Sequence, residues 1–361
     1  MSIGRGFLFR TIALIAVLMY ALLGSYSIKP GNAYLQEWII DVQTKNMDSD
    51  STEGIPPEEW IPFRVEDSFG FVSADGKLLE NSSIEWNIAL GDSTYCNYTQ
   101  QGSNLVIRDP IRNYLYPLSV EGYPVERGGD YFVLSKDLTA VTAFSATGEF
   151  LFSKEFPSII TSLDASEDTV GIGLLNGRVE LFNKDGGYQT GIQPETSRIN
   201  AVYGTALSFA SQKAAIVHGI DPQFLSLYQL EGTKSQRLSQ IEISDPRRSQ
   251  AKIAFSENGE YLLCETATEV LVISTEEPIG SFSLPLSGTL VDFEFFTELD
   301  SIYILEEDQD TAVLHIYSAE GRQYSKEKFS GRPHWLFQAE ENLYIGTGSL
   351  LRKVAIERFS K

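Results

Sequence analysis

One phrase recurs about every 35 to 46 residues from residue 68 to the C-terminus: two short apolar runs meet at a small polar turn, and a further run follows. The runs are rich in aromatic and β-branched residues, which suit strands, and the turns suit hairpins. A repeat of this period built from strands predicts an all-β protein folded as a β-propeller. The clearest copies are Phe255–Cys264 (FSENGEYLLC), Gly177–Gly186 (GRVELFNKDG) and Ala143–Phe152 (AFSATGEFLF).

The number of repeats predicts seven blades. Units begin near residues 84, 123, 159, 199, 250, 289 and 332, and the last unit has apolar runs for only three strands. The segment from Trp60 to Glu80 is also too short for a full blade. Because an open edge strand is a liability, we expect residues 60–80 to close the ring by pairing with the last unit. Eight blades are the alternative, if residues 60–80 form a blade of their own.

An uncharged apolar segment, Thr11 to Ile28, precedes the repeats. As a helix it is about 27 Å long, close to the thickness of a bilayer core. It therefore predicts one transmembrane signal-anchor helix. Arg5 and Arg10 precede it, so the positive-inside rule places the N-terminus in the cytoplasm and the propeller outside, in the periplasm if the protein is bacterial. The alternative is a signal peptide that is cleaved, which leaves a secreted protein.

The predicted organisation has four parts. Residues 1–10 form a short cytoplasmic N-terminus, residues 11–28 the anchor, residues 29–59 a juxtamembrane segment with an acidic linker, and residues 60–361 the propeller. Within the third part, residues 33–45 fit either a short amphipathic helix or a strand.

The charge of the chain restricts its partners. The formal net charge is −21. A surface of this sign repels phosphate backbones, so we expect no nucleic-acid partner. It is compatible with a solvating acidic coat, or with a surface that attracts a cation or a basic partner.

The two cysteines, Cys96 and Cys264, fall in different repeats. Both lie in runs expected to be strands. We therefore expect each to be a buried thiol rather than half of a disulfide.

Two repeats resemble known propeller families. Phe255–Leu263 is similar to the Phe-Ser-Pro-Asp-Gly phrase of WD repeats, with Glu257 and Asn258 in place of Pro and Asp. Phe144–Ser153 resembles the quinoprotein-like repeat but lacks its Trp. No unit has the Trp-Asp ending or the Gly-His pair of typical WD repeats. The resemblance covers about 300 residues and implies a diverged WD-repeat or quinoprotein-like propeller; it does not imply an activity.

No catalytic, cofactor-binding or metal-binding constellation is evident in the sequence. The three histidines, His218, His315 and His334, lie in different repeats and lack the spacing of zinc ligands. His334 and Trp335 open the last repeat, where a side chain can line the top face or the axial channel. Arg247 and Arg248 are a rare basic spot that can contact an acidic partner. We take His334, Trp335, Arg247 and Arg248 as candidate face or channel contacts.

These observations predict a membrane-anchored, non-catalytic propeller that binds protein partners on the outer side of the membrane. The alternative is a ligand-binding or hydrolytic propeller that acts on a sugar, peptide or cation at its axial channel. The alternative requires clustered carboxylates with shifted pKa values where the innermost strands converge.

Overall fold

The computed structural model describes residues 32–44, 60–194, 200–339 and 342–358. Every regular element in these ranges is a β-strand, which confirms the all-β prediction. The predicted transmembrane helix, Thr11 to Ile28, lies outside the described residues. In the part of the chain that is described, no helix is long and apolar enough to cross a membrane.

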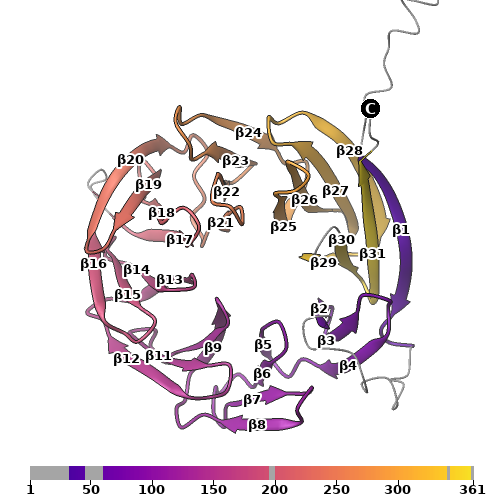
Figure 1. Ribbon diagram of the computed structural model, residues 1–361, viewed down its shortest axis with the longest axis horizontal. Coiled ribbons are helices and arrows are strands. Elements are labelled where there is room, and N and C mark those ends of the chain that lie inside the picture. Colours follow the sequence, from indigo (N-terminus) through magenta and orange to yellow (C-terminus); the bar gives the residue numbers. More distant parts are fainter. Residues whose placement is uncertain (1–31, 45–59, 195–199, 340–341, 359–361) are drawn as a thin grey trace, which may run out of the picture.

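The strands form eight antiparallel sheets that follow one another around a ring (Figure 1). We number these blades along the chain. Blade 1 contains β2 (Trp60–Val65), β3 (Ser68–Ser73) and β4 (Leu78–Ser83). Blade 2 contains β5 (Asn87–Leu90), β6 (Tyr95–Tyr98), β7 (Val106–Asp109) and β8 (Tyr114–Pro117). Blade 3 contains β9 (Tyr123–Arg127), β10 (Asp130–Leu134), β11 (Ala140–Ser145) and β12 (Phe150–Glu155). Blade 4 contains β13 (Ile160–Ala165), β14 (Thr169–Leu174), β15 (Val179–Asn183) and β16 (Tyr188–Ile192).

The second half of the ring repeats this order. Blade 5 contains β17 (Val202–Ser208), β18 (Lys213–His218), β19 (Phe224–Glu231) and β20 (Lys234–Glu242). Blade 6 contains β21 (Ile253–Phe255), β22 (Tyr261–Glu265), β23 (Glu269–Ser274) and β24 (Ser281–Pro285). Blade 7 contains β25 (Thr289–Phe296), β26 (Ser301–Asp308), β27 (Thr311–Ser318) and β28 (Gln323–Ser330). Blade 8 contains β29 (Pro333–Ala339), β30 (Asn342–Thr347), β31 (Leu350–Arg358) and β1 (Asn32–Asp41).

The prediction of seven blades closed by residues 60–80 is wrong. Residues 60–83 form blade 1, and the closing strand is β1, which pairs antiparallel with β31 as the outermost strand of blade 8. The propeller thus begins at Asn32 rather than at residue 60, inside the segment assigned to a juxtamembrane region. The strand alternative for residues 33–45 is confirmed up to Asp41. The blade count and the closing strand were predicted wrongly because a single closing strand has no repeating sequence pattern of its own.

β1 joins blade 8 to blade 1. Ile40 is buried opposite Leu351, whereas Ile39 on the other face of β1 is exposed. The indole Nε1 of Trp38 donates a hydrogen bond to the carbonyl oxygen of Ala74 in blade 1, at 3.1 Å. The side-chain amide of Asn81, also in blade 1, donates to the carbonyl oxygen of Val42, at 2.9 Å.

The apolar core is divided among the blade interfaces. Eight clusters of buried side chains are present in the described chain, and each lies between two neighbouring blades. The cluster between blades 8 and 1 contains Ile40 and Val42 from the N-terminal strand together with Phe63 and Leu351. Because each interface buries its own apolar surface, the ring has no single centre of stability.

A glycine in a hairpin turn packs on an aromatic side chain of the preceding blade at four interfaces. Each of these glycines has φ between 74° and 83°, in the left-handed region that favours glycine. A Cβ added at any of them would lie within 3.2 Å of the aromatic side chain. The repeated polar-glycine turn therefore has a packing role as well as a backbone role. The pairs are Gly76 with Trp38, Gly148 with Tyr116, Gly186 with Phe152, and Gly321 with Phe282.

The two cysteines are buried, unpaired thiols in separate clusters, as predicted. Burial raises the pKa of Cys96 to about 11. Both thiols are therefore structural side chains of the interfaces.

We expect Ile40→Ala to lower the free energy of unfolding by about 2–4 kcal/mol, because it opens a cavity in the closing interface. Ile39→Ala is the matched control: Ile39 is 47% exposed and Ile40 only 5%, so its effect should stay within about 0.5 kcal/mol. Urea unfolding followed by tryptophan fluorescence measures both. Equal losses would show that β1 is not seated as described.

A second pair of variants tests the turn contacts. Gly186 and Gly232 both have positive φ, of 81° and 60°, but only Gly186 has atoms of another side chain where a Cβ would go. Alanine at either position should cost about 1 kcal/mol for the left-handed backbone. Gly186→Ala should cost about 1–3 kcal/mol more, because it displaces Phe152. Denaturant unfolding measures the loss of stability of each variant. Similar losses for both would argue against a role of the turn in packing the two blades together.

Candidate functional site: the axial cavities

Among the described residues, three cavities lie around the axis of the ring, and each is bounded by strands of several consecutive blades. The first axial cavity, about 430 Å³, is lined from β2, β5, β6, β9 and β29 and the loop that follows β5. The second, about 620 Å³, is lined from β9, β13, β17, β21 and β22 and the residues before β21. The third, about 540 Å³, is lined from β21, β25 and β29 and the loops that follow β21 and β25. Arg127 lines the first and second cavities, and Phe337 lines the first and third, so the three are neighbours around one axis.

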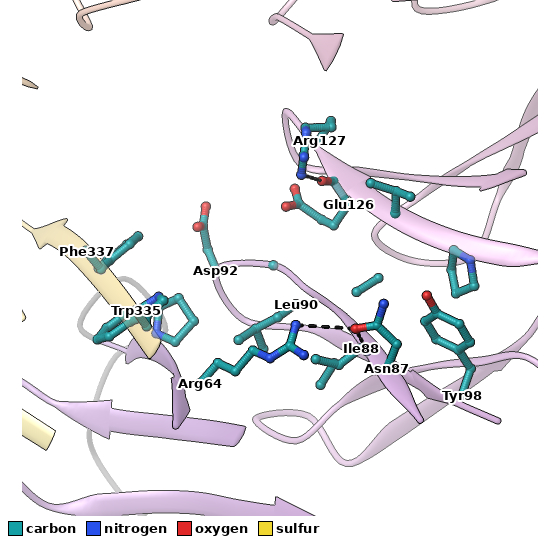
Figure 2. A pocket seen from close by; sticks show the side chains of 15 residues that line it. Arg64, Asn87, Ile88, Leu90, Asp92, Tyr98, Glu126, Arg127, Trp335 and Phe337 are labelled. Atoms are coloured by element: carbon teal, nitrogen blue, oxygen red, sulfur yellow. Dashed lines mark hydrogen bonds between the residues drawn. The ribbon is translucent and has the colours of Figure 1, made fainter. Parts of the chain in front are cut away.

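The first axial cavity combines three aromatic rings, one of them Tyr98, with two arginines (Figure 2). Trp335 and Phe337 of β29 are stacked, with ring centroids 5.4 Å apart and planes 10° apart. The Arg64 Nη1 group donates to the side-chain oxygen of Asn87, at 3.3 Å. The Arg127 Nη1 group donates to the backbone oxygen of Glu126, at 2.7 Å. Neither guanidinium forms an ion pair within the described chain, so both can take an external partner.

Glu126 lies beside Arg127 in the same cavity. Burial raises the pKa of its carboxyl to about 7. The Gly129 N–H donates a hydrogen bond to this carboxyl at 2.9 Å, which has the opposite, smaller effect on the pKa. The nearby Asp92 raises the pKa further, and Arg127 lowers it. Near neutral pH this wall of the cavity therefore exists in two charge states.

The second axial cavity places a carboxyl group between two blades. Asp164 of blade 4 accepts a hydrogen bond from the backbone N–H of Leu207 in blade 5, at 2.8 Å. The hydroxyls of Ser162 and Thr205, 2.8 Å apart, link the same two blades. Burial raises the pKa of Asp164 to about 6.

Lys252 provides the ammonium group of the second cavity. It forms an ion pair with Asp292 of β25 and lies 5.2 Å from the centroid of the Phe293 ring. Burial lowers its pKa to about 8, although the nearby Glu294 opposes this effect. Glu265 also lies in this cavity wall. Its carboxylate accepts a hydrogen bond from the backbone N–H of Lys252, at 3.0 Å, and forms an ion pair with Arg247.

The third axial cavity is acidic and aromatic. Three carboxyl side chains and three phenylalanines line it. Burial raises the pKa of Glu294 to about 7, with Lys252 opposing. Glu294 has no hydrogen-bond or ion-pair partner in the described residues. The acidic members are Glu257, Glu294 and Glu298, and the aromatic members are Phe255, Phe295 and Phe337.

Acidic groups predominate over the three cavities together. Seven carboxyl and three basic side chains line them, so the net charge around the axis is negative. The described residues contain no group of three or more His, Cys, Asp or Glu side chains placed to hold a metal ion. The carboxyl members are Asp92, Glu126, Asp164, Glu257, Glu265, Glu294 and Glu298, and the basic members are Arg64, Arg127 and Lys252.

The structure places the four residues proposed from the sequence in different surroundings. Trp335 lines the first axial cavity, and Arg247 lies behind the second, where it pairs with Glu265. His334 does not line any of the three cavities, and its Nε2 is buried without a hydrogen-bond partner in the described chain. Burial lowers the pKa of His334. Arg248 is exposed outside the cavities.

Sequence reasoning missed Arg64, Arg127, Lys252 and Glu294. All four depend on knowing which strand of each blade lies nearest the axis. A signal was present in β25, where Asp292 and Glu294 alternate with phenylalanines. Such alternation indicates a strand with one polar face, which in a propeller can be the face near the axis.

Comparison with known proteins agrees with this fold. A sequence profile for a family described as beta-propeller protein matches residues 4–360. The chain belongs to this beta-propeller family. An uncharacterized protein of Treponema pallidum (strain Nichols) is 21% identical over 295 residues, which cover 82% of this chain and 78% of the relative.

Solved propellers share the architecture at low sequence identity. BamB from Moraxella catarrhalis is 12% identical, with a TM-score of 0.61 over 90% of this chain and all of that one. The computationally designed Ika8 protein is 14% identical, with a TM-score of 0.58 over 82% and 95% of the two chains. Apo AztD from Citrobacter koseri is 12% identical, with a TM-score of 0.54 over 80% and 88%. These likenesses support the propeller fold and do not extend to the WD-repeat resemblance or to a function.

The raised pKa of Glu294 has a consequence for stability. The folded protein holds this proton more tightly than the unfolded chain, so stability is lost as the pH rises from about 4.5 through about 7. Glu294→Gln removes the free-energy cost of ionising this buried carboxyl. We therefore expect the variant to be more stable than the natural protein by about 1–2 kcal/mol at pH 8 and equal to it at pH 4. Urea unfolding at several pH values tests this. The control is Glu298→Gln, at an exposed carboxyl of the same cavity. A Glu294→Gln variant that is less stable than the natural protein at pH 8 would contradict the raised pKa of Glu294.

Proposed function

We propose that the protein is a non-catalytic docking platform that binds protein partners by a segment entering the axial cavities. The observation that carries the proposal is the set of polar side chains around the axis that have few or no internal partners. Arg64 and Arg127 form no ion pair in the described chain, and Glu294 forms neither a hydrogen bond nor an ion pair there. Arg64 and Arg127 are exposed and Glu294 is partly buried. A charged group of an external partner can therefore reach them and form charge-assisted hydrogen bonds with them.

The arrangement also suits an extended segment rather than a flat surface. The cavities follow one another around the axis, and the stacked rings of Trp335 and Phe337 offer an apolar surface next to charged groups. Clusters of this kind, with an aromatic centre and polar groups beside it, are typical of binding hot spots. The location of the propeller outside the cytoplasm stays a prediction.

A photo-crosslinking side chain at Phe337 tests the proposal. Benzoylphenylalanine keeps the aromatic character of this position, so the ring should fold and the partner should be captured in the cells that make the protein. Benzoylphenylalanine at the exposed Tyr188, on the outermost strand of blade 4, is the control. We expect a reproducible adduct from position 337 alone. Adducts from position 188 only, or from neither position, would overturn docking at the axis.

A second candidate, binding of a small ligand in the same cavities, is favoured by one specific observation. Glu126, Asp164 and Glu294 lie around the axis with raised pKa values, as the ligand-binding alternative requires. A melting-temperature screen with sugars, short peptides and divalent cations separates the two candidates. A ligand present at about 100 times its Kd should stabilise the protein by about 2.7 kcal/mol, and such a shift without any crosslinked protein would favour the small ligand.

A further inference from the structure

We propose that the third axial cavity binds the cationic end of a lysine or arginine side chain from a basic segment of the docked partner. This inference rests on the docking function proposed above and identifies the chemistry of the partner. It depends on the position of Glu294, on the two further carboxylates around it, and on the phenylalanines between them.

Glu294 is the central group of the site. It lines the cavity from β25 and lacks an internal hydrogen-bond or ion-pair partner in the described residues. The ammonium group of Lys252 acts on Glu294 through its charge, but its ion pair is with Asp292. The Glu294 carboxylate thus feels the charge of Lys252 but forms no hydrogen bond or ion pair in the described residues, and a cation from outside would gain a charge-assisted hydrogen bond there.

The rest of the wall fits the shape of a basic side chain. Glu257 and Glu298 add negative charge at the same cavity, and no basic residue lines it. Phe255, Phe295 and Phe337 supply an apolar surface for the methylene groups of a lysine or arginine stem and ring faces or edges for its charged end. A volume of about 540 Å³ is ample for such a side chain and part of its backbone.

The charge of the whole chain favours the same ligand. With a net charge of −21, the long-range field of the protein attracts cations and slows the approach of anions. An acidic segment would meet three carboxylates in this cavity. The other occupant with suitable chemistry is a free organic amine, which the experiment below separates from a protein side chain.

The test uses a fluorescein-labelled peptide with one central lysine and a matched peptide with norleucine in its place, each titrated with the purified protein at pH 8. We expect the lysine peptide to bind at least about tenfold more tightly, since norleucine keeps the stem and removes the charge. Glu294→Gln should weaken the lysine peptide by about tenfold and leave the norleucine peptide unchanged. The control variant is Glu320→Gln, at an exposed carboxylate in the turn between β27 and β28, and it should change neither affinity.

Three outcomes would overturn the inference. These are equal affinities for the two peptides, an unchanged affinity of the lysine peptide for Glu294→Gln, and binding of n-butylamine as tight as that of the peptide. The last result would assign the cavity to a free amine. If position 337 still crosslinks to a partner while any of these results holds, the proposal of docking at the axis stands. Only the inference that the docked side chain is basic is then wrong.

Discussion

Pairing of β1 with β31 is the interaction on which the rest of the ring depends. Each of the eight apolar clusters belongs to two blades, so every blade requires a neighbour on both sides. Without β1, blade 8 would lose its outermost strand, and the interface with blade 1 would lose Ile40 and Val42. An open ring would also expose a row of unpaired backbone groups on β31, which is an aggregation hazard. The closing strand therefore protects all the interfaces and not only its own.

The same division of the core explains why charged groups gather around the axis. Apolar side chains are buried between the blades, whereas the strands near the axis contribute side chains that line the axial cavities. Some of the charged groups there are satisfied by links between neighbouring blades. These links are the ion pair of Lys252 with Asp292 and the hydrogen bond from the Leu207 N–H to Asp164. Glu294 and the two arginines of the first axial cavity form no ion pair in the described residues.

The sequence predicted the strands and the repeat well because hairpin turns and apolar alternation are local signals. The glycine turns at residues 76, 148, 186 and 321 mark real hairpins, and their contacts with the preceding blade explain why the phrase recurs. The blade count failed where the signal is not local. β1 is an isolated strand whose partner lies more than 300 residues away, so neither its role nor the status of residues 60–83 could be decided from spacing.

The candidate site was harder to predict than the fold for a related reason. A charged residue in a strand is read as exposed unless its blade position is known. Trp335 was found because it opens a repeat, whereas Arg127 and Lys252 look like ordinary surface residues in the sequence. Only the ring brings β9, β21 and β25 around one axis, and it does so over a separation of more than 160 residues.

The antiparallel closure gives the ring a directional response to force. Asn32 pairs with Arg358, and Asp41 pairs with Leu350, so the two chain ends leave the closing pair at the same edge. Tension between those ends would separate β1 from β31 one residue pair at a time, beginning at Asn32. Tension between the N-terminal end and the body of the ring, along the strand, would instead load all the hydrogen bonds of the pair in shear. The mechanical strength of the ring thus depends on the direction of pulling, and it is least when the two ends are drawn apart.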